Sequence, residues 1–308
     1  MSSSLASTVL GLQFQNPILL AAGTAAYGRE LADVMALEEL GGFVTKAVSL
    51  EVRHGAPAPR VADFAGGMIN AVGLANPGVD GVLANDLPWI AAHLRRPRVL
   101  VNVVGREAAD FGAVVARLDQ AAGVEGYELN VSCPNVKQGG LEFGADPVAL
   151  AEVVRGARVA TRKPIFVKLS PTLPQIGEMA QRAVDAGADG ITVVNTIPGL
   201  VIDVEHRRPV LGFGSGGVSG PALLAVGVLA VRRVRQSVSV PIIGAGGIQQ
   251  VTDVVQYLMA GASLTAVGTA GLADPKLPGR LVRDLARWCD ARGVARIAEL
   301  IGTLEWPS

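Results

Sequence analysis

A lone thiol in a glycine-rich loop is the feature of this sequence best suited to chemistry. Cys133 comes just after the strand-like run 126–131, and Asn130 and Asn135 flank it with neutral amide groups. An unperturbed thiol has a pKa of about 8.5, so it ionises far more readily than a hydroxyl and can accept a proton near neutral pH. The loop therefore suits a thiol that takes or gives a proton. A buried structural cysteine is the alternative, because free cysteine is among the most buried residue types.

Polar residues and glycines recur where apolar strand-like runs end. A buried barrel interior is packed with apolar side chains, so polar groups at strand ends need another reason to be there. Any one of them could be a satisfied core amide or a snorkelling lysine, but the set predicts a site. Glycines after the last two runs are typical of phosphate binding through backbone N–H groups. The set comprises Lys46, Asn102, Asn130, Lys168, Asn195, Gly246, Gly247, Gly268 and Thr269.

The histidines and acidic residues do not form a recognisable metal or acid–base pattern. His54, His93 and His206 fall in expected loops or helices without ligand spacing, which predicts surface residues and no metal site. No carboxylate pair follows the strand-like runs, which argues against chemistry of the glutamate acid–base type. The site is therefore expected to work with amides, lysines and the thiol.

Two further motifs were weighed. The segment 212–217 fits the dinucleotide pattern Gly-x-Gly-x-x-Gly, but it lies in an insertion and no acidic residue follows about twenty positions on. A nicotinamide site on this chain therefore has no support. Lys46 or Lys168 could be the Schiff-base lysine of an aldolase-like barrel. That alternative leaves Cys133 and the amides unexplained.

Composition narrows the class of ligand and the compartment. The 308 residues carry 27 basic and 27 acidic side chains, so no basic field favours nucleic acid or an anionic membrane. Two distant cysteines cannot form a disulfide framework or hold an iron–sulfur cluster, which suits a reducing cytoplasm. Neither a signal peptide nor an apolar membrane span is evident. A cytoplasmic protein with a small-molecule ligand is expected.

Short apolar runs alternate with helical patterns along the whole chain, which predicts an α/β fold. Half of the residues are hydrophobic and only 4% aromatic, as in parallel strands buried on both faces. Eight strand–helix units predict a (β/α)8 TIM barrel, with residues 1–308 as a single domain. Loop-like insertions at 51–78 and 197–220 follow strands, so they are expected at the C-terminal face. The expected strands are 18–21, 43–46, 99–103, 127–131, 165–169, 191–195, 241–244 and 264–268, and the expected helices include 30–40, 108–122, 148–161, 176–186, 221–235 and 251–259.

Four groups of motifs stand out together: 130–140 with Phe143-Gly144, 70–74 with 76–78, Asn195-Thr196, and 216–221. Together they resemble one enzyme family, the class 1 dihydroorotate dehydrogenases. The resemblance runs from about Leu10 to the last strand, and it is to the catalytic subunit of the class 1B, NAD-linked form. Class 2 relatives carry serine where this chain has Cys133. The fumarate-dependent class 1A form looks like Cys-Pro-Asn-Val-Pro-Gly here, so residues 137–140 point to class 1B.

The resemblance implies an FMN-dependent oxidation of (S)-dihydroorotate to orotate in pyrimidine biosynthesis. Cys133 would remove the proton from ring C5 while a hydride passes from C6 to flavin N5, and Lys168 would stabilise the reduced ring. By similarity, FMN would contact Ala22, Gly23, Lys46, Ala47, Asn102, Asn130, Lys168, Val194, Gly220, Gly246, Gly247, Gly268 and Thr269. The substrate would be held by Lys46, Asn70, Ala71, Val72, Gly73, Leu74, Asn130, Asn135, Asn195 and Thr196.

The same resemblance implies partners and leaves rivals open. In the class 1B form a second subunit carries FAD and a [2Fe-2S] cluster and passes electrons to NAD, so a homodimer joined by that iron–sulfur flavoprotein is expected. Relatives often have serine at Ala22 and an aromatic–glycine pair near Ala25-Ala26, and 212–215 also differs. The rivals are a fumarate-using class 1 enzyme, a dihydropyrimidine dehydrogenase-like module that prefers uracil-type substrates, and a non-enzymatic flavin-binding barrel.

Overall fold

A closed barrel of eight parallel strands forms the centre of the molecule, in a computed structural model that describes residues 4–132 and 143–307. Neighbouring strands follow the order β10-β15-β16-β3-β4-β7-β8-β9. The (β/α)8 prediction is confirmed, and each expected strand is present with its ends shifted by no more than two residues. The strands are β3 (Ile18–Leu20), β4 (Gly42–Val44), β7 (Arg98–Val103), β8 (Gly126–Asn130), β9 (Ile165–Leu169), β10 (Gly190–Val193), β15 (Ile242–Ala245) and β16 (Leu264–Val267).

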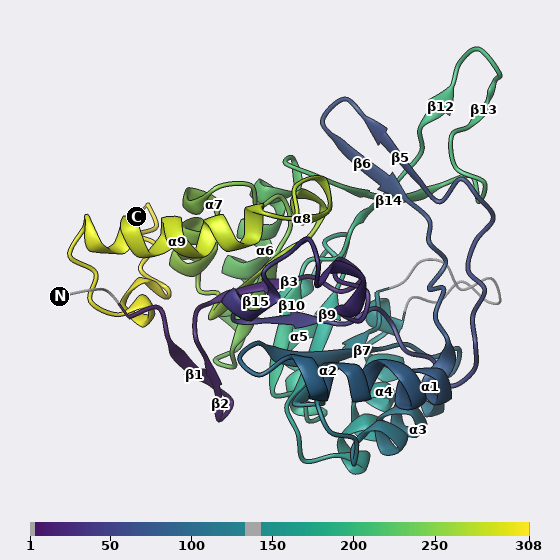
Figure 1. Cartoon of the computed structure of the whole chain (residues 1–308), viewed down its shortest axis with the longest axis horizontal. Coiled ribbons are helices and arrows are strands. Elements are labelled where there is room, and N and C mark those ends of the chain that lie inside the picture. Colours follow the sequence, from purple (N-terminus) through teal and green to yellow (C-terminus); the bar gives the residue numbers. More distant parts are fainter. Residues whose placement is uncertain (1–3, 133–142, 308) are drawn as a thin grey trace.

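Helices pack around the outside of the barrel, and their ends follow from local sequence (Figure 1). Asp146 caps α4 because its side chain accepts hydrogen bonds from the backbone N–H groups of Val148 and Ala149. Gly261 ends α7 in the left-handed region, with φ of 118°. The helices are α1 (Gly78–Gly81), α2 (Leu87–His93), α3 (Ala108–Leu118), α4 (Pro147–Ala160), α5 (Ile176–Asp185), α6 (Leu223–Ser237), α7 (Val251–Ala260), α8 (Thr269–Ala273) and α9 (Leu277–Asp290).

The prediction of a helix over 30–40 is wrong. Two short 3-10 turns, Arg29–Leu31 and Leu37–Glu39, occupy this segment, and the backbone breaks at Ala36, with ψ of 73°. Met35 and Leu37 are both buried. In a continuous helix these two residues would lie about 200° apart at 3.6 residues per turn, so one of them would face solvent. The break allows both to reach the core.

The two insertions expected as loops contain strands that pair with each other. Their strands form a four-stranded antiparallel sheet in the order β11-β14-β6-β5, which we call the insertion sheet. It comprises β5 (Val61–Phe64), β6 (Gly67–Asn70), β11 (Ile197–Gly199) and β14 (Gly216–Ser219). A hairpin of β12 (Ile202–Asp203) and β13 (Arg208–Pro209) extends beyond it. Figure 1 shows both projecting from the barrel on the side away from α9.

Side chains alternate along the barrel strands between an inner layer and the helices. On β8, Tyr127 and Leu129 pack outward in the large core under the helices, whereas Glu128 and Asn130 lie on the other face. Phe166 and Leu100 fill the lower barrel interior, together with residues of the hairpin β1 (Ser7–Val9) and β2 (Leu12–Phe14). The apolar filling thus stops below the carboxyl ends of the strands. Among the described residues, no helix combines the length and apolar character that crossing a membrane requires.

Candidate active site

A cavity of about 730 Å³ opens at the carboxyl ends of the barrel strands. The strand ends form its floor, and its wall includes Met68 and Asn70 of β6 and Gly217 of β14. Two insertions that are far apart in the sequence therefore complete one site, because β6 pairs with β14 through Asn70 and Gly217. Ligand cavities typically measure 300–1,000 Å³, so the space suits a cofactor together with a small substrate.

Most of the sequence-predicted site residues line this cavity. Ala71 does not: it is buried in a small cluster with Ile69 and Leu211 under the insertion sheet. Cys133 and Asn135 lie outside the described residues. The predicted residues that line the cavity are Ala22, Gly23, Lys46, Ala47, Asn70, Val72, Gly73, Leu74, Asn102, Asn130, Lys168, Val194, Asn195, Thr196, Gly220, Gly246, Gly247, Gly268 and Thr269.

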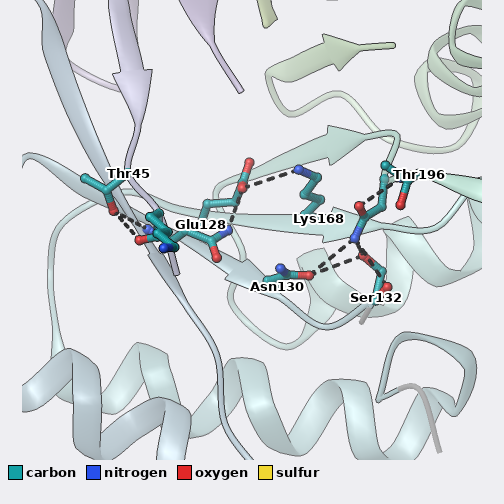
Figure 2. Close-up of polar contacts among 9 residues, drawn as sticks. Thr45, Glu128, Asn130, Ser132, Lys168 and Thr196 are labelled. Atoms are coloured by element: carbon teal, nitrogen blue, oxygen red, sulfur yellow. Dashed lines mark hydrogen bonds and ion pairs between the residues drawn. The ribbon is translucent and has the colours of Figure 1, made fainter. Parts of the chain in front are cut away.

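A chain of polar contacts crosses the cavity floor from β7 to β9 (Figure 2). Asn102 donates from Nδ2 to Glu128 Oε1 at 2.7 Å, and Lys168 Nζ lies 3.9 Å from the same oxygen. Strand register brings these groups together, because Asn102 pairs with Glu128 and Asn130 pairs with Lys168. Next to Asn102, directly after β4, the Thr45 hydroxyl accepts a hydrogen bond from the Asn102 backbone N–H and donates one to the Lys46 carbonyl.

Two groups in this series of polar contacts have hydrogen-bonding capacity that the other described residues do not use. Within the described residues, Asn102 Oδ1 is buried without a partner. Likewise, the Lys168 ammonium makes no hydrogen bond to another described residue, although the side chain is only 9% exposed. Buried polar groups are normally paired, because an unpaired one costs about 1–3 kcal/mol. Since both residues line the cavity, this capacity is available to a ligand there.

An amide cluster forms a second polar patch beside the floor, as Figure 2 shows. Asn195 Nδ2 donates to Ser132 Oγ at 2.7 Å and lies 3.5 Å from Asn130 Oδ1. Its own Oδ1 accepts from the backbone N–H of Thr196. Asn130 ends β8, and Asn195 lies two residues after β10. Their side chains offer both donors and acceptors, which suits the amide edge of a planar heterocycle.

Glycines shape the other end of the cavity. Gly246 and Gly247 follow β15 with φ of 123° and 71°, a region that other residues rarely adopt. A Cβ at Gly247 would come 2.8 Å from Leu224 Cα, so any side chain would collide with the first turn of α6. Backbone N–H groups and the start of α6 thus meet in a space that side chains leave open, as expected for an anion such as phosphate.

Tyr257 on α7 supports this glycine turn from below. Its hydroxyl donates to the Gly246 carbonyl at 2.7 Å, and its ring packs so closely on Gly244 that a Cβ there would overlap it. Burial raises the pKa of the Tyr257 phenol, so the group stays neutral and keeps the proton that it donates. The conformation of the turn therefore depends on a residue that does not line the cavity.

Sequence reasoning missed several functional residues. Glu128 and Ser132 support the floor, and Ser219 accepts a hydrogen bond from Thr269 at 2.7 Å, which joins the insertion sheet to the start of α8. A glutamate within the strand-like run 126–131 was the available signal for Glu128. Met68 and Gln249 line the cavity without any sequence pattern that marks them.

The structure also places the three histidines, the segment 212–217 and the second cysteine, none of which was predicted to belong to the site. His54, His93 and His206 are exposed, as predicted. The segment 212–217 lies in the insertion around the start of β14 and not in a tight turn directly after a barrel strand, as predicted. Cys289 is buried in α9, where burial raises the pKa of its thiol. It lies in the helix-covered core and does not line the cavity.

Comparisons with known proteins agree on one family. The family model described as dihydroorotate dehydrogenase matches residues 4–288. A relative from Pelobacter propionicus, named dihydroorotate dehydrogenase B (NAD(+)), catalytic subunit, is 43% identical over 99% of this chain and all of that protein. A Bacillus pumilus protein of the same name is 44% identical over 95% of this chain and 94% of its own length. The crystal structure of DHODH from Eimeria tenella in complex with ferulenol superposes with a TM-score of 0.84 over 97% of this chain and 88% of that one; at 23% identity it shows the shared fold.

Proposed function

The chain belongs to the dihydroorotate dehydrogenase family, and from this premise we propose that it oxidises (S)-dihydroorotate to orotate in pyrimidine biosynthesis. The observation that carries the proposal is the cavity itself. It combines a glycine turn suited to phosphate, a buried ammonium and amide on its floor, and an asparagine cluster beside them. Flavin and pyrimidine rings both need neutral donors and acceptors of this kind.

FMN fits the groups that the cavity offers. Bound there, FMN supplies the acceptor for the hydride that leaves the substrate. Gly220, Gly246, Gly247, Gly268 and Thr269 would hold the phosphate, and Ala22, Gly23, Lys46, Ala47, Asn102, Asn130, Lys168 and Val194 would surround the ring and ribityl chain. The free Oδ1 of Asn102 and the N–H donors of Lys168 support this placement, because both stay unsatisfied among the described residues until a polar ligand arrives.

The substrate would lie against the asparagines and Lys46. Lys46 is half-buried and forms no ion pair with any other described residue, so its ammonium is available to a carboxylate. Asn130, Asn195 and Thr196 would bind the amide and imide edge of the ring. Residues 70–74 would contribute mainly through Asn70, Val72, Gly73 and Leu74, since Ala71 faces away from the cavity. The role of Asn135 rests on the sequence resemblance.

Proton removal from C5 is assigned to Cys133, again from the sequence resemblance. We expect Cys133→Ala to retain yellow, bound FMN and to lose turnover by at least a hundredfold, because a positioned base contributes about 10²–10⁴-fold. Steady-state rates with dihydroorotate, alongside the flavin absorbance spectrum, measure both quantities. Cys289→Ala is the matched control and should keep its rate, since that thiol does not line the cavity. A fully active Cys133→Ala enzyme would contradict the assignment.

The electron acceptor is proposed from the names of the relatives. Both relatives are called the catalytic subunit of an NAD(+) enzyme, which supports a partner subunit for this chain. We propose a homodimer joined by an iron–sulfur flavoprotein that carries FAD and a [2Fe-2S] cluster and passes electrons to NAD in the cytoplasm. Two cysteines cannot supply the four thiolates of a [2Fe-2S] cluster, which supports a cluster on the partner and not on this chain.

One anaerobic experiment tests the function. The purified chain is loaded with FMN and mixed with dihydroorotate, and bleaching of the flavin absorbance is followed. Fumarate is then offered, and afterwards NAD with and without the partner subunit. Bleaching followed by reoxidation only with NAD and partner is the expected result. Reoxidation by fumarate alone would identify the fumarate-using class, and reduction by dihydrouracil in preference to dihydroorotate would identify a uracil-type enzyme. A chain that binds FMN but never bleaches would overturn the proposal.

A further inference from the structure

Glu128 is a carboxylate in the middle of the barrel that the proposed reaction does not use. It is 1% exposed and does not line the cavity. Its side chain contacts Asn102 of β7 and Lys168 of β9, and both of these residues line the cavity. A carboxylate at such a place is costly unless it is paired and hydrogen-bonded. Both conditions are met here by groups that also face the ligand.

The contacts of Glu128 converge on one oxygen. Oε1 accepts the Asn102 amide at 2.7 Å and lies 3.9 Å from Lys168 Nζ. The Asn102 bond fixes which way that amide points, because donating from Nδ2 to Glu128 leaves Oδ1 aimed elsewhere and unpaired within the described residues. The ammonium is held near the carboxylate at more than hydrogen-bond distance. Its N–H donors therefore stay free for the cavity.

We propose that Glu128 is a positioning residue that sets the effective charge of Lys168 and so the reduction potential of the bound flavin. This inference rests on the proposed function, since it needs FMN at the cavity floor. A reduced flavin carries more negative charge than an oxidised one, so a nearby cation favours the reduced form. Glu128 offsets part of that cation's field, and this effect is strong in a dry interior where charges are weakly screened.

The sign of the effect follows from the charges. Glu128→Gln removes the anion but keeps the side-chain volume and an oxygen that can accept the Asn102 hydrogen bond. Lys168 then acts on the flavin with nothing to offset it. The reduced flavin is therefore stabilised relative to the oxidised flavin, and the midpoint potential rises. We expect at least a tenfold change in the reduced-to-oxidised ratio, which is about 30 mV for a two-electron couple.

The experiment is a spectroscopic redox titration of the FMN-loaded enzyme. The midpoint potential of Glu128→Gln is compared with that of the wild type and of Glu125→Gln. Glu125 makes a matched control: it is ion-paired with Arg98 at 2.5 Å and accepts a hydrogen bond from Val99 N, but it precedes β8 at the opposite end of the strand. The control should lose stability and keep the wild-type potential. An unchanged potential in Glu128→Gln would overturn the inference.

A second variant covers the case in which Glu128→Gln does not retain flavin. Glu128→Asp keeps the charge but withdraws it by one methylene, so it should retain FMN and show a smaller rise in potential. If neither variant folds or retains FMN, Glu128 is a structural residue and the inference fails. A wild-type chain that is not reduced by dihydroorotate contradicts the proposed function instead. The two failures are thus distinguishable.

Discussion

Two lysines face the same cavity in different electrostatic surroundings. Lys168 extends from the middle of β9, and Glu128 lies 3.9 Å from its ammonium. Lys46 follows β4, where its backbone N–H donates to the Ala26 carbonyl, and its ammonium forms no ion pair with another described residue. An uncompensated cation attracts an anionic group more strongly than a paired one does. The difference favours Lys46 as the partner of the substrate carboxylate.

We therefore expect Lys46→Met to weaken the binding of dihydroorotate and orotate by about tenfold to a hundredfold. A hydrogen bond to a charged group is worth about 1.5–3 kcal/mol, and methionine preserves most of the apolar stem. Orotate affinity, followed through the flavin spectrum, measures the loss. Binding of uracil, which has no carboxylate, should change little.

Lys276→Met provides the matched control for this variant. Lys276 is exposed and does not line the cavity, so its replacement should leave orotate affinity unchanged. Equal losses of orotate and uracil binding in Lys46→Met would show that Lys46 shapes the cavity and does not pair with the carboxylate.

At the scale of elements, α7 supports the glycine turn that follows β15. The Gly246 carbonyl in this turn accepts a hydrogen bond from the Tyr257 hydroxyl, which fixes the orientation of that peptide group. Tyr257→Phe removes this hydrogen bond and leaves the ring that packs against Gly244. A buried hydrogen bond contributes about 0.5–1.5 kcal/mol, so we expect FMN to bind about fivefold more weakly. Fluorescence titration of the apoprotein with FMN measures the change.

Tyr127→Phe separates this effect from general destabilisation. Tyr127 is also buried, but its hydroxyl donates to Asp119 Oδ1 on the outer side of the barrel, under α3. Its replacement should lower the melting temperature without changing FMN affinity. If both variants lose FMN affinity equally, Tyr257 has no specific role in the turn.

The sequence predicted those elements that carry their own local signal. β8 and β9 are short apolar runs bounded by turns, and α4 has a capping aspartate followed by proline at its first turn. The insertion sheet has no such signal. Ser219 pairs with Met68, which lies 151 residues earlier in the sequence, and Gly216 and Gly217 are poor strand formers on their own. Tertiary pairing alone makes these residues strands.

The residues of the candidate site also fall into those that the sequence could predict and those that it could not. Asn102 and Lys168 could be found because polar residues at strand ends are unusual in an apolar barrel. Tyr257 could not, because a tyrosine on the apolar face of a helix looks like any core residue. The orientation of Ala71 was also hidden, since it depends on which face of β6 packs against Leu211.

At the scale of the whole molecule, barrel closure depends on a buried asparagine before β3. Asn16 is 2% exposed; its Nδ2 donates to the Glu39 carbonyl, and its Oδ1 accepts from the backbone N–H groups of Ile18 and Gly41. It thereby ties the start of β3 to the start of β4. These bonds lie at the opposite end of the strands from the cavity.

We expect Asn16→Ala to lower the free energy of unfolding by about 2 kcal/mol, because it leaves buried backbone groups without partners. The FMN affinity of the folded protein should not change. Urea unfolding of the apoprotein and FMN titration measure the two quantities. Asn85→Ala, on an exposed helical turn where its amide donates to Gly81 O, should be nearly neutral. A large loss of FMN affinity in Asn16→Ala would show that the two ends of the barrel are coupled.

The pairing of β6 with β14 also sets the order in which the molecule can mature. Met68 and Asn70 leave the ribosome early, but their partners Ser219 and Gly217 follow about 150 residues later. Closing so long a loop costs entropy that only the nearly complete barrel can repay. A growing polypeptide consequently has no finished wall to enclose a prosthetic group. Loading of the flavin belongs to the end of synthesis, after β15 and β16 have closed the barrel.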